Sequence, residues 1–180
     1  MSEYQDVIIA GFGGQGVMLA GNLLAQAGME HGLEVTFIPV YGAEMRGGTA
    51  NCNVILSDTP VGSPIVQHPN VLMVMNNPSL DKYEDTVAPG GKIFVDSTLI
   101  GRKVRRTDVE AYYIPATGLA GEMGVPTLAN MLLLGALVEK TGCVRFDSIA
   151  PALHKVIPAR KADLFDVNMK AVEAGKAYQG

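Results

Sequence analysis

The residues with the clearest chemical meaning lie in a glycine-rich turn near the start of the chain. Its glycines Gly11, Gly13 and Gly16 have the spacing G-x-G-x-x-G, and Gly14 and Gln15 lie between them. Glycines let a ligand approach the backbone closely, and the N–H groups at the start of a following helix attract phosphate or carboxylate. The Gln15 amide adds two donors and one acceptor. The pattern therefore predicts a turn that receives an anionic or polar group.

A second glycine loop, YGAEMRGG at positions 41–48, follows the second predicted strand. Gly47 and Gly48 can adopt positive φ and form a nest of N–H groups, and Arg46 adds a positive charge. We expect this loop at the same sheet edge as the first turn, because ligands of open α/β sheets bind where the strands end. A surface ion pair between Arg46 and Glu44 is the alternative interpretation.

Nicotinamide nucleotide binding is the obvious alternative function for the first turn. It requires an Asp or Glu about 20 residues on, at the end of the second strand, to bind the ribose. Pro39, Val40 and Tyr41 occupy that place, and Glu44 and Arg46 come later, inside the loop. The sequence therefore disfavours a stand-alone dinucleotide-binding oxidoreductase. A third interpretation is that the glycines only allow a strand and a helix to pack closely.

Catalytic and metal-binding patterns are scarce. Cys52 and Cys143 form no C-x-x-C pair, and His31, His68 and His154 are scattered. No G-x-S-x-G motif is present. We therefore predict no catalytic residue and no metal ligand on this chain, and we interpret both cysteines as core residues.

Composition narrows the function classes further. The chain has 180 residues, 48% hydrophobic and 18% charged, with a net charge of −4, which predicts one domain over residues 1–180 and argues against nucleic-acid binding. No apolar run is long enough for a membrane span and no secretory signal is visible, so we expect a cytoplasmic protein. The basic run at positions 101–106 is interpreted as a solvated loop, or else as a contact for an acidic partner or a ligand phosphate.

Hydrophobic periodicity predicts the elements that position these residues. Strands and helices alternate, which indicates an α/β fold with a mostly parallel sheet covered on both faces. Ser79 and Asp147 are candidate helix N-caps, and Asn76, Asn77 and Asp96 are interpreted as turn caps at the strand ends. The predicted strands are 7–10, 34–40, 49–57, 71–75, 92–95 and 111–114, and the predicted helices are 17–31, 79–87, 127–141, 147–156 and 161–174.

Several segments together resemble a known family. GFGGQGV at 11–17, YGAEMRGG at 41–48 and PTLANMLLLGALVEKTG at 126–142 are similar to the gamma subunit of the 2-oxoacid:ferredoxin oxidoreductases. The segments TANCNVILSD and NNPSLDKYEDTVAPGG fit the same pattern, so the resemblance covers essentially the whole chain. It implies a Rossmann-like three-layer α/β/α domain and a subunit that is inactive alone.

The resemblance also implies partners and cofactors. Such complexes decarboxylate a 2-oxoacid with thiamine diphosphate and Mg²⁺ on alpha and beta subunits. They pass electrons through [4Fe-4S] clusters, often on a ferredoxin-like delta subunit, to ferredoxin, and transfer the acyl group to coenzyme A. The gamma subunit is expected to aid assembly and the coenzyme A side of the site, and it can form a homodimer when isolated. The overall likeness favours 2-oxoglutarate or branched-chain substrates over pyruvate and indolepyruvate. The candidate hosts for coenzyme A phosphates are Gly11, Gly13, Gly14, Gln15, Gly16, Arg46, Gly47 and Gly48.

Overall fold

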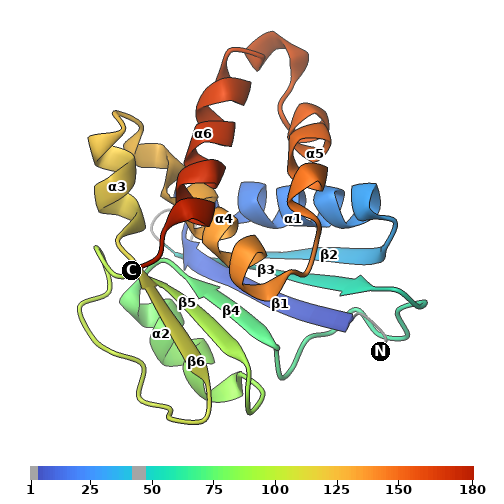
Figure 1. Ribbon diagram of the computed structural model, residues 1–180. Helices are drawn as coiled ribbons and strands as arrows, with labels where there is room; N and C mark the ends of the chain where they lie inside the picture. Colours follow the sequence, from blue (N-terminus) through green and yellow to red (C-terminus); the bar gives the residue numbers. More distant parts are fainter. Residues whose placement is uncertain (1–3, 42–47) are drawn as a thin grey trace.

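The computed structural model describes residues 4–41 and 48–180, built around a six-stranded sheet of order β2-β3-β1-β4-β5-β6 (Figure 1). The strands of this sheet are β1 (Tyr4–Phe12), β2 (Glu34–Tyr41), β3 (Thr49–Ser57), β4 (Val71–Val74), β5 (Lys92–Asp96) and β6 (Glu110–Ile114). β1, β4, β5 and β6 are parallel to one another, and β3 is antiparallel to both of its neighbours, β1 and β2. β2 therefore runs in the same direction as β1, and the prediction of a mostly parallel sheet is confirmed.

Helices cover both faces of the sheet. α1 (Val17–His31) and α4 (Ala129–Thr141) lie on one face, where α5 (Ile149–Val156) and α6 (Leu164–Ala177) form a further layer outside them (Figure 1). α2 (Asn77–Tyr83) covers the other face. Successive strand residues point to opposite faces, so β1 supplies both cores. The α/β/α arrangement is therefore as predicted, and α5 and α6 add to it on the side of α1 and α4.

Two glycines allow the outer layer to pack closely. A Cβ on Gly135 of α4 would lie 2.0 Å from the carbonyl oxygen of Val172, and a Cβ on Gly175 of α6 would lie 1.8 Å from that of Leu132. The backbones of α4 and α6 thus touch directly at their crossing. This contact fixes α6 on the buried helix that also reaches the glycine turn.

Some local predictions were wrong. The N-cap of α2 is Asn76, whose Oδ1 accepts from the Ser79 N–H at 2.8 Å, and not Ser79 itself. Asp147 does not cap α5, since its carboxylate accepts from Arg145 Nε at 3.2 Å. Single-turn 3-10 helices precede α4 and α5, at 126–128 and 146–148, so both α-helices begin later than predicted.

One helix, α3 (Ala116–Glu122), was not predicted from the sequence. Two glycines within seven residues weaken its intrinsic propensity. The buried Asp96 carboxylate compensates by accepting from both N–H and Oγ1 of Thr117 in the first turn of α3, at 3.3 and 2.6 Å. None of the helices within residues 4–41 and 48–180 combines the length and apolar character needed to cross a membrane.

Candidate functional site

The glycine turn joins the end of β1 to the start of α1, as the sequence predicts. Gly14 has φ of 95° and Gly16 has φ of 75°, a region of backbone conformation that favours glycine. The Gln15 N–H donates to the Phe12 carbonyl oxygen at 3.2 Å and closes the turn. Gly16 is the N-cap of α1, and its carbonyl oxygen accepts the first helical N–H, that of Ala20, at 3.0 Å.

The four glycines of the turn fall into two kinds. A Cβ on Gly11 would lie 2.6 Å from Gln15 Oε1, and a Cβ on Gly16 would lie 2.3 Å from Asn130 Nδ2, so packing within the chain requires these two. A Cβ on Gly13 or Gly14 would meet no described residue within 4 Å, and both glycines are exposed. Gly13 has neither a positive φ nor a close neighbour among residues 4–41 and 48–180 to explain it. Close packing therefore accounts for part of the motif only.

The Gln15 side chain turns into the protein. Its Oε1 accepts from the Phe12 N–H at 2.6 Å, and its Nε2 donates to the Met75 carbonyl oxygen at 3.0 Å. Asn76 Nδ2 lies 3.5 Å from the same Oε1. Gln15 thus ties the turn to the carboxyl end of β4. Its amide therefore shapes the turn: Oε1 and one N–H donor of Nε2 are used within the chain.

Asn130 is a site residue that the sequence analysis missed. It is the second residue of α4 and is 1% exposed, and its Nδ2 donates to the Gly16 carbonyl oxygen at 3.0 Å. A single amide inside the apolar run at 129–138 was the signal that could have found it. The contact joins residues 114 positions apart, which local periodicity cannot reveal.

Gly48, the last residue of the second glycine loop, lies beside the first turn. The Gly13 N–H donates to the Gly48 carbonyl oxygen at 3.2 Å, and β3 begins at the next residue. Because β1 and β2 run in the same direction, their carboxyl ends share one edge, as predicted. Arg46 and Gly47 lie outside the described residues.

The geometry of this edge differs from that of a dinucleotide-binding unit. β3 lies between β1 and β2, so the end of β2 is two strand spacings, roughly 10 Å, from the end of β1. Val40 and Tyr41 at the end of β2 carry no carboxylate and are exposed. Neither the position nor the residue types suit a ribose hydroxyl pair.

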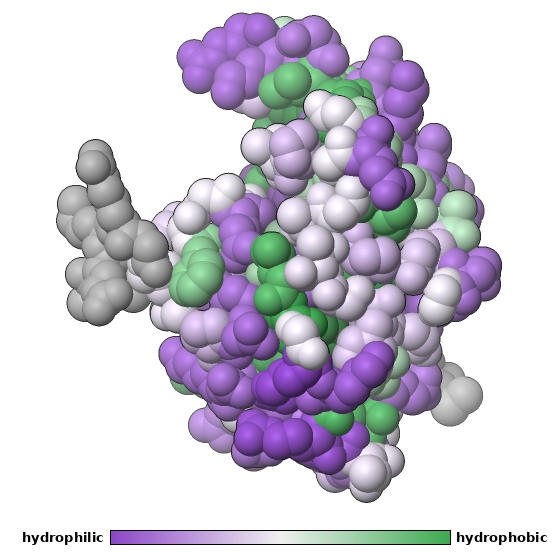
Figure 2. Space-filling model, turned by 90° about the vertical axis from the view of Figure 1, so that its left-hand side faces the viewer, coloured by the Kyte–Doolittle hydropathy of each residue, from purple (hydrophilic) through white to green (hydrophobic). Residues whose placement is uncertain are grey.

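The start of α1 provides the electrostatic feature of the edge. Within residues 4–41 and 48–180, the N–H groups of Val17, Met18 and Leu19 have no acceptor, and α1 has no side-chain cap. The positive end of the helix dipole adds to these donors. Figure 2 views the molecule from the side where the parallel strands end, and shows hydrophobic residues in the middle with hydrophilic residues gathered below. The edge can therefore bind an anionic group next to apolar surface.

Polar residues at the other strand ends serve the fold. Asn76 caps α2, and Asp96 accepts from the Thr98 N–H at 3.1 Å as well as from Thr117. Both side chains are buried. Their interpretation as turn caps is confirmed.

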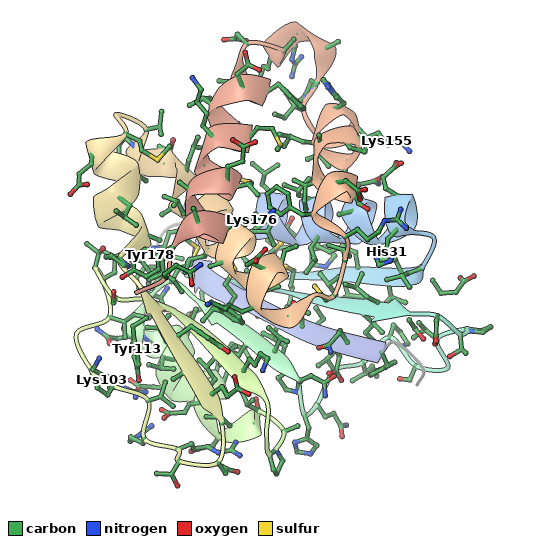
Figure 3. The ribbon with its side chains drawn as sticks, viewed as in Figure 1. His31, Lys103, Tyr113, Lys155, Lys176 and Tyr178 are labelled. Carbon is green, nitrogen blue, oxygen red and sulfur yellow. The ribbon has the colours of Figure 1, made fainter. Side chains whose placement is uncertain are left out.

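The basic run at 101–106 is not simply a solvated loop. The Glu84 carboxylate, which is 0% exposed, accepts from Arg102 Nη2 at 2.8 Å, from Arg105 Nε at 3.3 Å and from the Arg105 backbone N–H. Lys103 lies over the Tyr113 ring, 3.8 Å from its centre (Figure 3). Partners within the chain therefore hold this segment against α2 and β6.

The cysteines are buried, and the histidines make contacts within the chain. Cys52 and Cys143 are buried, which raises the pKa of both thiols, that of Cys52 to about 12. His31 accepts from a backbone N–H, His68 lies 3.2 Å from a backbone carbonyl oxygen, and His154 stacks on a phenylalanine ring. In the part of the chain that the structure describes, no three His, Cys, Asp or Glu residues come together as a metal site.

Comparison with known proteins places this geometry in context. Residues 6–178 match the model of the family "Pyruvate ferredoxin/flavodoxin oxidoreductase". The ketoisovalerate oxidoreductase subunit VorA of Methanothermobacter thermautotrophicus is 42% identical over 174 residues, which cover 96% of this chain but 36% of VorA. The chain thus spans about a third of that relative's length.

Solved structures share the whole fold. The gamma subunit of a keto/oxoacid ferredoxin oxidoreductase from Geobacter sulfurreducens has a TM-score of 0.81 at 28% identity, with 95% of each chain covered. A 2-oxoglutarate:ferredoxin oxidoreductase from Magnetococcus marinus, with 2-oxoglutarate, coenzyme A and succinyl-CoA bound, has a TM-score of 0.87 at 26% identity. There the similarity covers 97% of this chain and 31% of the other.

Proposed function

Because the chain belongs to the pyruvate ferredoxin/flavodoxin oxidoreductase family, we propose that it is the gamma subunit of a multisubunit 2-oxoacid:ferredoxin oxidoreductase. Residues 1–180 act in it as one gamma-type domain. The chain corresponds in length to the Geobacter gamma subunit, and to about a third of VorA and of the Magnetococcus chain. In this proposal the remaining parts of the complex lie on other polypeptides, and the isolated chain is inactive.

The proposed reaction converts a 2-oxoacid and coenzyme A to acyl-CoA and CO2, while two electrons pass to ferredoxin. Thiamine diphosphate with Mg²⁺ on alpha and beta subunits supplies the decarboxylation chemistry, and [4Fe-4S] clusters, some on a ferredoxin-like delta subunit, carry the electrons. Among the described residues, no three His, Cys, Asp or Glu side chains form a metal site, and both cysteines are buried. This chain contributes to assembly and to the coenzyme A side of the site.

We assign the phosphates of coenzyme A to the edge where β1 and β2 end. The N–H groups of Val17 to Leu19 and the dipole of α1 suit a phosphate. The open backbone at Gly13 and Gly14 allows close approach, and Arg46 and Gly47 of the second loop add charge and donors by their chemistry. The exposed side chains of Phe12 and Leu19, on either side of the turn, add apolar surface that suits the less polar pantetheine arm.

One observation carries the assignment: no contact among the described residues requires a glycine at position 13. Gly13 lies exposed beside N–H donors that have no acceptor among the described residues, and the sequence places no acid at the end of β2 to bind a ribose. Approach of a ligand or a partner subunit explains it. The stand-alone Rossmann-type oxidoreductase is not favoured.

Native purification with a tagged chain tests the function. Larger chains that bind thiamine diphosphate should co-purify, and the complex should reduce ferredoxin only when a 2-oxoacid and coenzyme A are both present. Screening 2-oxoglutarate, branched-chain oxoacids, pyruvate and indolepyruvate identifies the substrate. Tight NADH binding and unaided turnover by the isolated chain would overturn the proposal. Calorimetric titration of the complex with coenzyme A, comparing wild type with Arg46→Ala, tests the loop: unchanged affinity removes Arg46 from the site.

A further inference from the structure

The side chain of Asn130 is buried although burial of this amide is unfavourable for stability. Within residues 129–138, the other nine buried positions of α4 are apolar residues or glycine. Burying an amide is unfavourable unless its hydrogen bonds are made. Nδ2 of Asn130 finds the Gly16 carbonyl oxygen, but its Oδ1 is buried without a partner among the described residues. An apolar side chain would avoid that penalty, which points to a role other than core packing.

The orientation of the Asn130 amide follows from its contact. Gly16 offers a carbonyl oxygen, which only the NH2 end of the amide can satisfy. The amide lies over the Cα of Gly16: a Cβ there would be 2.3 Å from Nδ2 and 3.5 Å from Oδ1. Only glycine at position 16 leaves room for this arrangement.

The contact controls the direction of the first N–H group of α1. The Gly16 carbonyl and the Val17 N–H belong to one planar trans peptide and point in opposite directions. Two donors, Ala20 N–H and Asn130 Nδ2, each at 3.0 Å, hold that carbonyl oxygen inside the protein. The Val17 N–H is thereby turned away from the core. The residue that precedes Gly16 is Gln15, and its side chain is held in place by hydrogen bonds to Met75 and Phe12.

We propose that Asn130 is a positioning residue that aims the N-terminus of α1 at the phosphate of the bound co-substrate. This inference rests on the proposed function, in which coenzyme A binds at this edge. Asn130 itself touches no ligand, since both of its polar atoms are buried. Its effect passes through the peptide between Gly16 and Val17.

The chain contains a matched control, Asn168 in α6. This asparagine is also buried, its Nδ2 donates to the Leu164 carbonyl oxygen at 2.7 Å, and its Oδ1 also lacks a partner among the described residues. It has no contact with the glycine turn. Asn168→Ala therefore reproduces the loss of a buried amide without the proposed effect on α1.

Steady-state kinetics of the intact complex test the proposal. For Asn130→Ala we expect the KM for coenzyme A to rise about five- to tenfold, because one well-oriented hydrogen bond to an anion is lost. The kcat and the KM for the 2-oxoacid should stay unchanged. Asn130→Asp keeps the shape but places an acceptor against the Gly16 carbonyl, and should raise that KM further. Asn168→Ala should leave all three constants unchanged. An unchanged KM for coenzyme A in Asn130→Ala, or an equal rise in Asn168→Ala, overturns the proposal.

Backbone order parameters of the isolated full chain give a second measurement that needs neither partner subunits nor coenzyme A. They should fall at Gly16 and Val17 in Asn130→Ala and stay at the wild-type value in Asn168→Ala. If Asn130→Ala does not assemble into the complex, the order parameters alone test the proposal. Unchanged order parameters at Gly16 and Val17 overturn it. A wild-type complex whose turnover does not depend on coenzyme A instead refutes the proposed function, while the order parameters still test the positioning.

Discussion

Replacing Glu84 by glutamine should destabilise the chain strongly, because Glu84 is a fully buried carboxylate that organises the 101–106 segment. Two arginine side chains and two backbone N–H groups bind it. Glutamine keeps the shape but removes the charge. Losing one partner of a buried ion pair typically costs about 3–5 kcal/mol. We expect the free energy of unfolding to fall by about 3 kcal/mol, the lower end of this range, because the Arg102 and Arg105 side chains are 28% and 63% exposed. For a chain of this size the melting temperature should fall by roughly 6–12 °C.

Asp81→Asn is the matched control. Asp81 pairs with the same Arg102, at 2.6 Å, but its side chain is 58% exposed, so its loss should cost less than about 1 kcal/mol. Urea denaturation followed by circular dichroism measures both free energies of unfolding. A loss in Glu84→Gln no larger than that in Asp81→Asn would refute the assignment of Glu84 as the organising group.

The stability difference between wild type and Glu84→Gln should depend on pH in a defined direction. Burial by itself would raise the pKa of Glu84, but the Arg105 N–H and the Arg102 guanidinium outweigh it and hold the pKa below the ordinary 4.5. A lowered pKa in the folded state stabilises the fold above the unfolded pKa, and this stabilisation is lost as the pH falls through the folded value. The difference between wild type and Glu84→Gln should therefore be constant near neutral pH and shrink below about pH 4.5.

Three further outcomes follow from the packing. Gly135→Ala should destabilise the fold by about 3 kcal/mol or more, because its methyl group would meet the backbone of α6. Gly121→Ala in α3 has open space and should stabilise the fold by about 0.5–1 kcal/mol. Thermal melts compare the two variants directly. Gly13→Ala should leave the melting temperature unchanged but raise the KM for coenzyme A in the complex; an unchanged KM would mean that no ligand group approaches Gly13. Cys52 and Cys143 should resist a thiol reagent at pH 8 until denaturant is added, and rapid labelling of the native chain would contradict their burial.

The order of residues was enough to predict the features that depend on neighbouring residues. The period of apolar residues placed α1, β2 and β3, with their ends correct or nearly so. Gly32 and Gly142 marked the ends of α1 and α4, because a left-handed C-cap favours glycine, and φ is 91° and 62° there. The glycine turn between β1 and α1, and the missing acid at the end of β2, could also be read directly from the order of residues.

The polar groups that face a ligand could be distinguished from those that serve the fold once the folded chain was known. The sequence predicts that the Gln15 amide faces a ligand, but its Nε2 donates to the carbonyl oxygen of Met75, 60 residues away, inside the protein. The carboxylate of Glu84 holds a basic segment that looked solvated, and Asn130 reaches Gly16 from a helix 114 residues later. Hydrogen bonds and ion pairs of this kind form where folding brings distant backbone and side-chain groups within about 3 Å. Local periodicity carries no information about such distances, so the partners became visible only once the sheet and its helices had placed them.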